Sequence, residues 1–357
     1  MPGGPTPLPA MAYLFEQAGG LWRTRPGLTG GRGPSFEGRL SDYERARRLH
    51  DDLVAEYRGR TVEDVFGGRE VASSSGTCYV VESRSPMELD GRDPDRAASA
   101  VLADLTLIHG IGEATGRRLM RQGYLTVADL ARHPRYCREA AGLLCAVEQG
   151  DTCGLADRIG RRHRCSDPLI LQVSRFHAAG DLLFLDIETL GLFGRPIILI
   201  GLARVEHGSI VVRQYLLRSI SEERAALAAV IPYLEAEGAA LVTFNGRAFD
   251  LPYIGERLAR HGIPADLGLP HFDILHPARR RWKDAFGTCR LCALETNVLG
   301  IGRENDIPSG MVPEFYESYR RTNNPGPLVP VLEHNRQDLV SLARLFYILR
   351  GDGSGGS

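Results

Sequence analysis

The segment 182–187 constrains the fold of this chain more than any other feature of its sequence. It is a short and almost wholly apolar run, and such a run predicts a strand buried in the core. Asp186 and Glu188 are two residues apart, so both side chains point to one face of the strand. Leu185 and Ile187 point to the opposite face. The sequence therefore predicts a buried sheet that presents two acids on one of its faces.

The elements after this strand are further strands and helices in a characteristic order. Strands are predicted at 197–205, 210–217, 241–244 and 271–275, and helices at 222–237, 251–261 and 329–349. Three successive strands, followed by strands that helices separate, are typical of a mixed sheet with helices on its faces. We therefore expect residues 175–350 to form one α/β domain.

The first half of the chain has a different pattern and divides into shorter segments. Residues 1–40 are rich in Gly and Pro and are expected to be flexible. Residues 41–96 contain a predicted helix at 42–57 and a predicted hairpin at 71–84, and form a small α+β region. Residues 97–165 have a helical pattern, and residues 351–357 are a Gly/Ser tail that we expect to be flexible.

Carboxylates stand next to apolar elements in three separate places. Asp186 and Glu188 end the first strand, Asp250 follows a later strand, and Asp338 lies in the last helix. His334 is four residues before Asp338, so the two share one helix face. Each place alone has an ordinary structural explanation, as a turn residue, a helix cap or a surface i,i+4 pair. Their joint occurrence is what indicates a site.

Convergence of these groups would suit a metal-dependent hydrolase. Clustered carboxylates repel one another and resist burial, and Mg²⁺ and Mn²⁺ remove that cost because both prefer oxygen ligands. Two such ions roughly 3.5–4 Å apart can bind the attacking and leaving oxygens of a phosphodiester. A histidine beside them can accept the proton of the attacking water near neutral pH.

Four stretches of the chain resemble the motifs of a known nuclease family. They are 185–192, 243–252, 289–295 and 334–342, and together they cover most of residues 180–347. The acidic pattern, with a His or aromatic residue four positions before the last Asp, resembles the DEDD superfamily of 3′–5′ exonucleases. More narrowly, the chain looks like the YprB-type ribonuclease-H-like family.

The resemblance implies a ribonuclease-H-like fold and a metal-dependent exonuclease. It implies that four carboxylates hold two Mg²⁺ or Mn²⁺ ions and that a histidine is the general base, these residues being Asp186, Glu188, Asp250, Asp338 and His334. We also expect Thr189 and Asn245, which lie inside the motifs, to contact nucleic acid.

In one respect the chain departs from the superfamily. The histidine branch of that superfamily usually has four residues between the His and the last Asp, whereas three residues separate His334 from Asp338. The departure leaves two roles open for His334, which either deprotonates the water or orients it.

The segment 107–119 resembles a helix-hairpin-helix motif. Gly110 and Gly112 would form the tight turn, and the next helix would direct free backbone N–H groups to a phosphate. Arg117 and Arg118 would add positive charge. Such contacts position a protein on nucleic acid without reading its sequence, and the motif favours DNA over RNA as the partner. The alternative is a plain helical hairpin whose glycines serve only the turn.

Two further groups of residues have both a functional and a structural explanation. The run 279–283 contains three Arg, Trp282 and Lys283, and Trp282 either stacks on an unpaired base or belongs to the core. Among the 7 Cys, two sets were considered as metal ligands: Cys137, Cys145, Cys153 and Cys165 are expected to be isolated thiols, and Cys289 and Cys292 are expected in the core.

Composition narrows the classes of function. The net charge of −1 argues against a protein that binds nucleic acid through an overall positive charge. The sequence contains no Walker A motif, so it gives no indication of ATP hydrolysis. No apolar run approaches the ~18 residues of a membrane span, and the N-terminus lacks a signal-peptide pattern. We therefore expect a cytoplasmic protein without a membrane partner.

The sequence thus predicts a 3′–5′ exonuclease that hydrolyses terminal phosphodiester bonds of single-stranded DNA with two metal ions. Two alternatives use the same site, namely an RNA exonuclease and a structure-specific endonuclease. A third alternative is a non-catalytic DNA-binding adaptor that uses only the hairpin motif.

Overall fold

The computed structural model describes residues 36–73, 75–87, 91–192, 194–303 and 306–351. The flexible segments expected at 1–40 and 351–357 therefore lie largely outside the described residues, as does Ser74 in the predicted hairpin turn. Helix α2 spans Phe36–Glu56, so the chain is already helical before residue 41, where the first ordered region was expected to begin.

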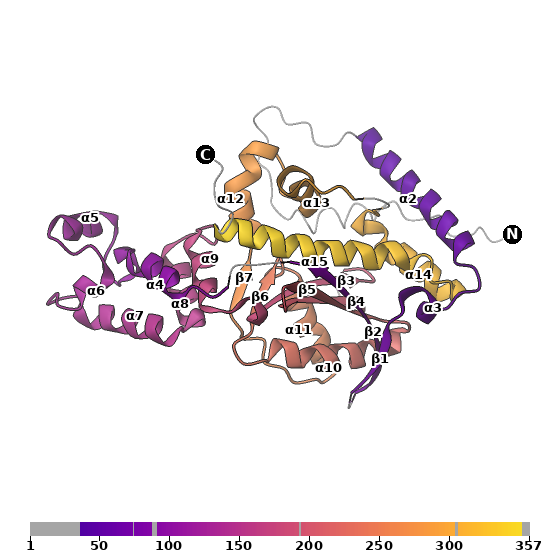
Figure 1. Ribbon diagram of the computed structural model, residues 1–357, viewed down its shortest axis with the longest axis horizontal. Coiled ribbons are helices and arrows are strands. Elements are labelled where there is room, and N and C mark those ends of the chain that lie inside the picture. The colour runs from indigo at the N-terminus through magenta and orange to yellow at the C-terminus, as the bar shows by residue number, and fades with distance from the viewer. Residues whose placement is uncertain (1–35, 74, 88–90, 193, 304–305, 352–357) are drawn as a thin grey trace.

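A seven-stranded sheet forms the centre of the described structure, in the order β1-β2-β5-β4-β3-β6-β7 (Figure 1). The strands are β1 (Arg69–Ser73), β2 (Gly76–Pro86), β3 (Leu182–Thr189), β4 (Ile197–Glu206), β5 (Ser209–Leu216), β6 (Ala240–Thr243) and β7 (His271–Asp273). Strands β3, β4 and β5 form an antiparallel meander, β6 runs parallel to β3, and β7 runs parallel to β6. The predicted mixed sheet is confirmed.

The N-terminal hairpin is part of this sheet. Strand β2 pairs antiparallel with β5, from Tyr79 opposite Leu216 to Pro86 opposite Ser209. We expected the hairpin to belong to a separate region at 41–96. The sequence does not reveal its pairing with β5, because two strands so far apart in the chain leave no local pattern. The hairpin covers the edge of β5, and β1 becomes the outer strand.

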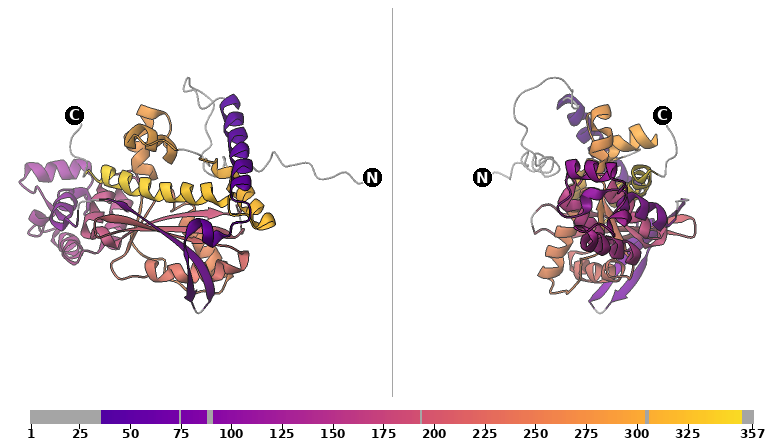
Figure 2. Two further views of the ribbon diagram at one scale, coloured as in Figure 1. Left: turned by 45° about the vertical axis from the view of Figure 1, so that its right-hand side comes forward. Right: turned by 90° about the vertical axis from the view of Figure 1, so that its left-hand side faces the viewer.

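Helices cover both faces of the sheet. Helices α10 (Glu223–Leu234) and α11 (Asp250–Arg260) pack on one face, and the long helix α15 (Leu328–Arg350) crosses the other (Figure 1). The same region contains α12 (Leu275–Phe286), α13 (Leu291–Leu294), a π-helical turn (Glu295–Leu299) and α14 (Val312–Thr322). Before the sheet come α2 and α3 (Val62–Phe66), and α2 projects from the sheet with its C-terminal end near α14 (Figure 2).

The side chains of β3 alternate between two cores. Phe184 belongs to the core beneath α15, where its ring packs against Phe346. Leu185 belongs to the core that α10 and α11 cover. Asp186 and Glu188 share the face of Phe184, as the period of two in a strand requires, and therefore point towards α15.

A group of helices at one end of the sheet forms the helical domain, residues 94–173 (Figure 1). It consists of α4 (Pro94–Leu102), α5 (Glu113–Arg121), α6 (Val127–Leu130), α7 (Cys137–Gln149), α8 (Thr152–Arg162) and α9 (Leu169–Val173). It is joined to the end of α15, because Arg175 Nη2 and Gln172 Nε2 donate to Arg350 O at 3.0 and 2.9 Å. The side chains of Arg175 and Arg350 are fully buried, so the helical domain is attached to α15 through buried polar contacts.

The predicted α/β class is confirmed, and the elements differ from the predicted ones mainly at their ends. The helix predicted at 222–237 begins with a 3-10 turn (Ile220–Glu222) and ends at Leu234. Among the described residues, we find no helix with the length and apolarity that a membrane crossing requires.

Candidate active site

The acids of β3 meet the face of α15 that carries His334 and Asp338. His334 Nε2 lies 4.0 Å from Glu188 Oε1 and 3.7 Å from Asp338 Oδ2. The spacing of four residues places His334 and Asp338 on one side of the helix, above the C-terminal end of β3. All three side chains are largely buried. A histidine therefore faces two of the predicted acids in a shielded site.

Asp250 reaches the same site from the first residue of α11. Its Oδ1 accepts a hydrogen bond from Ile187 N at 3.2 Å. Because Ile187 separates Asp186 from Glu188, this bond places the third acid beside the other two. The side chain of Asp250 is 5% exposed, so it is as shielded as the rest of the cluster.

Asp273 fixes the turn that delivers Asp250. It ends β7, and its carboxylate accepts hydrogen bonds from Asn245 N at 2.9 Å and from Arg247 N and Leu275 N, both at 3.0 Å. Asn245 has a φ of 73°, a left-handed conformation that Asn tolerates better than most residues. The predicted nucleic-acid contact at Asn245 thus lies in the rigid turn before the third acid.

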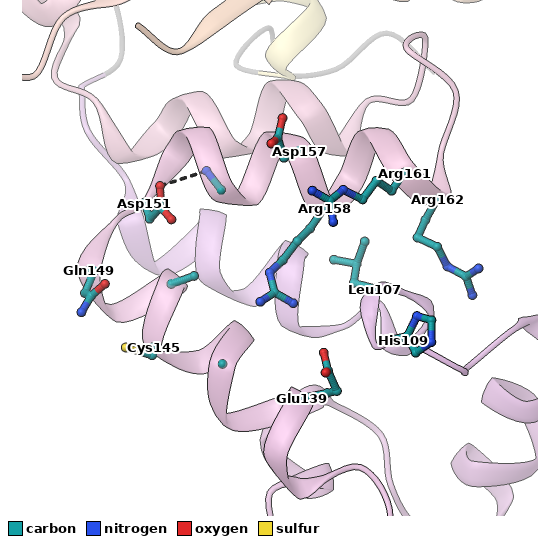
Figure 3. Close-up of a pocket in the computed structure, with 13 residues that line it drawn as sticks. Leu107, His109, Glu139, Cys145, Gln149, Asp151, Asp157, Arg158, Arg161 and Arg162 are labelled. Atoms are coloured by element: carbon teal, nitrogen blue, oxygen red, sulfur yellow. Dashed lines mark hydrogen bonds between the residues drawn. The ribbon is translucent and has the colours of Figure 1, made fainter. Parts of the chain in front are cut away.

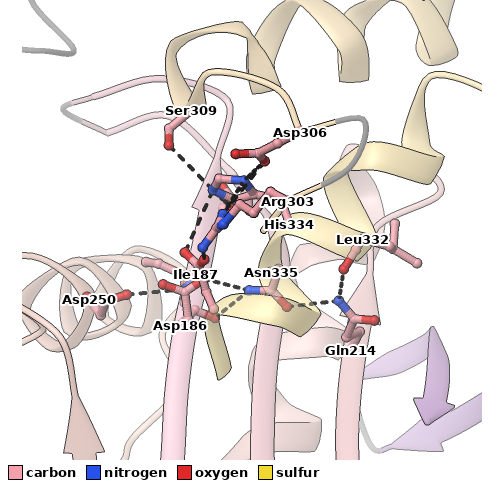
Figure 4. Close-up of polar contacts among 12 residues, drawn as sticks. Asp186, Ile187, Gln214, Asp250, Arg303, Asp306, Ser309, Leu332, His334 and Asn335 are labelled. Carbon is pink, nitrogen blue, oxygen red and sulfur yellow. Dashed lines mark hydrogen bonds and ion pairs between the residues drawn. The ribbon is translucent and has the colours of Figure 1, made fainter. Parts of the chain in front are cut away.

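Asn335 connects Asp186 to the interior of the sheet. Its Nδ2 donates to Asp186 Oδ2 at 2.7 Å, and its Oδ1 accepts from Gln214 Nε2 at 2.9 Å (Figure 4). Gly201 of β4 makes room for this amide, because a Cβ there would lie 2.2 Å from Asn335 Oδ1. Asn335 is fully buried and therefore holds one oxygen of Asp186 in a fixed orientation.

Burial and mutual repulsion raise the pKa values of the clustered carboxylates. The pKa of Asp186 lies well above its usual value, first because of burial and then because of the charges of Asp338, Asp250 and Glu188. Burial is also the largest cause for Glu188 and for Asp250, and each of these pKa values is raised to about 7. Carboxylates this close and this buried retain their charges only when cations neutralise them.

The neighbours of His334 favour its positively charged form. Burial disfavours the imidazolium, but Asp338, Asp306 and Glu188 outweigh it and raise the pKa of His334 to about 10. Nδ1 of the ring lies 2.7 Å from Asp306 Oδ1. That contact leaves Nε2 as the nitrogen nearest to the acids of the site.

A buried arginine completes the polar cluster. Arg303 Nη2 contacts Asp338 Oδ1, its Nε lies 2.5 Å from Glu295 Oε2, and its Nη1 lies 3.0 Å from His334 Nδ1. The side chain of Arg303 is 9% exposed and that of Glu295 is fully buried. A guanidinium thus occupies the space beside the fourth acid.

The structure brings together all five residues that were predicted as catalytic: Asp186, Glu188, Asp250, His334 and Asp338. It also places around them five residues that the sequence analysis did not assign: Asp273, Glu295, Arg303, Asp306 and Asn335. Glu295 and Asn335 lie inside the motifs of the resemblance, and that was a signal that could have identified them. Thr189, a predicted nucleic-acid contact, is 4% exposed at an irregularity of β3, so little of its surface is accessible to a ligand.

The donor chemistry of the cluster fits hard divalent cations. The four predicted ligands are carboxylates, and Mg²⁺ and Mn²⁺ prefer oxygen. Among the described residues, however, no three acidic, His or Cys side chains already form a set of metal ligands. Protein donors hold the oxygens instead, since Asn335 contacts Asp186, the backbone of Ile187 contacts Asp250, and Arg303 contacts Asp338.

The predicted hairpin motif forms a tight turn in the helical domain. Gly110 has a φ of +82°, which favours glycine, and Gly112 is the N-cap of α5 without a capping side chain. Arg117 and Arg118 are exposed on α5, and Arg117 Nη1 lies 3.9 Å from Glu113 Oε2. The element before the turn is a 3-10 turn (Leu105–Leu107) rather than a full helix.

A cavity of about 600 Å³ lies beside this hairpin, between α7 and α8 (Figure 3). Arg162 on its wall is structural, because it donates to Thr106 O at 2.7 Å and also to Ile111 O. The other arginines of the wall are Arg158 and Arg161, and the acids are Glu139, Asp151 and Asp157. The acids balance the arginines, so the cavity is not a strongly basic surface.

Two expectations outside the acidic cluster are settled by burial. Trp282 is 8% exposed and belongs to the core, with Arg281 covering its ring, so stacking on a base is not supported. Cys289 is half-buried, but Cys292 is exposed, so the predicted core position is wrong for Cys292. The short helix α13 turns Leu294 rather than Cys292 inwards.

Comparisons with known proteins agree with this architecture. Residues 183–350 match the family described as the RNase_H superfamily. The chain is 37% identical over 171 residues to the uncharacterized protein YprB of Bacillus subtilis (strain 168), across 46% of this chain and 41% of that protein. The chain thus spans about two fifths of the length of this relative. The part of the chain that carries the acids, residues 183–350, is thus similar to the ribonuclease H superfamily.

Proposed function

We propose that this protein is a metal-dependent 3′–5′ exonuclease that hydrolyses terminal phosphodiester bonds of single-stranded DNA. The similarity of residues 183–350 to the ribonuclease H superfamily supports a nuclease. The observation that carries the finer proposal is the convergence of four acids with His334 in one buried site. The resemblance to the DEDD exonucleases supports the choice of a terminal bond.

The four acids would hold two Mg²⁺ or Mn²⁺ ions. When bound, such ions neutralise the cluster, lower the pKa of a water and stabilise the leaving oxygen. Asn335 orients Asp186, and Asp273 orients the turn before Asp250. Rigid, buried contacts therefore position the carboxylates, and a purely structural cluster would not need them.

His334 is proposed as the general base. Asp338, Asp306 and Glu188 raise the pKa of His334. Ions bound to Asp338 and Glu188 would neutralise two of these charges and so lower the pKa, while the contact with Asp306 would remain. Asp306 accepts the proton of Nδ1, and Nε2 is then free to accept a proton on the side of the acids. Orientation of the water, the second role left open for His334, would use the same nitrogen.

The hairpin of the helical domain is proposed to bind the DNA backbone. Free N–H groups at the start of α5 attract phosphate, and Arg117 and Arg118 add charge on the same helix. The junction at Arg175 and Arg350 joins this domain to the end of α15. The bound DNA would thus be held at a fixed position relative to the helix that carries His334.

A degradation time course with labelled oligonucleotides tests this function. Single-stranded DNA, double-stranded DNA and RNA of one sequence, labelled at either end, would be incubated with Mn²⁺, Mg²⁺ or EDTA. We expect stepwise shortening of 5′-labelled single-stranded DNA and early release of a 3′-labelled mononucleotide, both abolished by EDTA. Preference for RNA would indicate an RNA exonuclease, and internal cuts would indicate an endonuclease. Binding without cleavage under every condition would contradict the proposal in favour of an adaptor.

A further inference from the structure

The guanidinium of Arg303 competes with a cation for Asp338. Its Nη2 contacts Asp338 Oδ1, while its Nε holds Glu295 Oε2. A carboxylate oxygen that is paired with a guanidinium is blocked for another positive charge, because the two cations repel each other at short distance. A cation can therefore bind Asp338 through this oxygen only after Arg303 has moved.

Glu295 offers the displaced guanidinium a second position. The carboxylate of Glu295 is fully buried, and its Oε1 has no hydrogen-bond partner among the described residues. A buried acceptor without a partner carries the full cost of its lost hydration. Arginine and carboxylate commonly pair through two parallel N–H···O bonds. By turning towards Glu295, Arg303 would satisfy Oε1 and release Asp338 in the same movement.

We infer that Arg303 is a two-position switch of the metal site. In the metal-free protein it neutralises Asp338, and when a divalent cation binds it leaves Asp338 for a two-bond pair with Glu295. The inference rests on the proposed function, because it requires a divalent cation at Asp338. Arg303 is a positioning residue in this scheme, and it sets the affinity for the ion without touching the substrate.

The switch predicts opposite effects for two substitutions in the same buried pair. Arg303→Gln removes the competitor, and we expect the Kd for Mn²⁺ to fall on the order of tenfold, the size of a typical coupling between two sites. Glu295→Gln removes the charge of the second position, so Arg303 stays at Asp338 and Mn²⁺ binds more weakly. A pair that does not move gives the same two signs, because one change removes a positive charge near the ion and the other removes a negative charge. In that case the two effects would nearly cancel in the double variant, so the double variant distinguishes the switch from a static pair.

Calorimetric titration of the full chain with MnCl₂, in the absence of nucleic acid, measures these affinities without relying on hydrolysis. The set contains the wild type, R303Q, E295Q and the double variant R303Q/E295Q. The double variant removes both partners of the pair, so it remains informative even where R303Q alone unfolds. We expect it to bind Mn²⁺ as tightly as R303Q, because the second position is irrelevant once the competitor is absent.

Arg336→Gln is the matched control. Arg336 lies two residues from His334 on the same helix, but it pairs with Glu333, through contacts that include one of 2.8 Å, outside the acidic cluster. We expect its Kd for Mn²⁺ to equal that of the wild type. Shifts of R303Q and E295Q in one direction, or a double variant that binds no more tightly than the wild type, would overturn the switch and leave the nuclease proposal intact. Failure of the wild type to bind Mn²⁺ would overturn both.

Discussion

Nδ1 of His334 lies 2.7 Å from Oδ1 of Asp306, and the other ring nitrogen is the one nearest to Glu188 and Asp338. A carboxylate on one side of an imidazole fixes which nitrogen carries the proton and holds the ring in one orientation. Asp306 is therefore expected to determine how well His334 accepts a proton from the side of the acids.

Replacement of Asp306 by Asn tests this relationship. We expect kcat to fall roughly 10–100-fold, the usual effect of losing an outer carboxylate partner, with little change in the Kd for Mn²⁺. Steady-state release of labelled nucleotide and a Mn²⁺ titration would measure the two quantities. An unchanged kcat would show that Asp306 does not orient the ring during turnover.

Asp186→Asn is expected to separate activity from stability. Loss of a metal-holding carboxylate removes several kcal/mol of transition-state stabilisation, which corresponds to a decrease in kcat on the order of 10³-fold. The melting temperature in EDTA should rise by roughly 2–4 °C, about 1 kcal/mol for a domain of this size, because burial and neighbouring acids oppose the charge of Asp186. Differential scanning calorimetry and a nuclease assay would measure both. A melting temperature below that of the wild type would contradict the repulsion.

The stability of the metal-free protein is expected to decrease from pH 6 to pH 8. Glu188 and Asp250 have pKa values of about 7, raised above those of unfolded carboxyl groups. Such groups favour folding while they are protonated, and they lose this contribution as the pH rises through the folded-state pKa. His334, with a pKa of about 10, has the same sign, because its contribution is complete only below its unfolded pKa of about 6.5.

Bound Mn²⁺ should reverse this trend, because it neutralises the carboxylates that repel one another. The increase in melting temperature caused by MnCl₂ is therefore expected to be larger at pH 8 than at pH 6, where protons compete for the same oxygens. Thermal melting at both values with MnCl₂ or EDTA measures the difference. A variant with both Glu188→Gln and Asp250→Asn should lose most of the pH dependence, and a pH-independent increase in the wild type would argue against these two ligands.

Arg117 and Arg118 are expected to govern DNA binding rather than hydrolysis. Replacement of both by Gln should weaken DNA binding in EDTA. The slope of log K for DNA binding against log salt concentration should become less steep by about 1 for each phosphate that α5 no longer neutralises. Fluorescence anisotropy at several salt concentrations measures the slope. Arg320→Gln on α14, where Arg320 pairs with Glu317, is the control and should leave the slope unchanged. Equal slopes for the double variant and the control would exclude a role for α5.

Local rules predicted the acidic site well. The period of two placed Asp186 and Glu188 on one face, and the spacing of four placed His334 beside Asp338, because both rules follow from backbone geometry alone. Arg303 and Asp306 could not be found in this way. They lie between the π-helical turn and α14, in a segment without periodicity, and only the folded chain brings them to α15.

Contacts between distant segments were likewise beyond local rules. The order of strands and helices was sufficient to predict the mixed sheet. However, no local pattern in the sequence indicates that Tyr79 of β2 pairs with Leu216 of β5. The buried junction between Arg175 and Arg350 is of the same kind, because isolated arginines usually indicate an exposed surface. In both cases the contact depends on shape and on unsatisfied backbone groups, which a single sequence does not display.

The pairing of β2 with β5 also bears on how this protein can be divided. A shortened chain that starts at residue 175 would retain every proposed ligand and lose the strand that lies along Ser209–Leu216. The unpaired backbone N–H and C=O groups along β5 would then form an exposed sheet edge, to which a strand of a second molecule could add. Self-association through this edge, rather than loss of the proposed catalytic groups, is the expected fate of such a fragment.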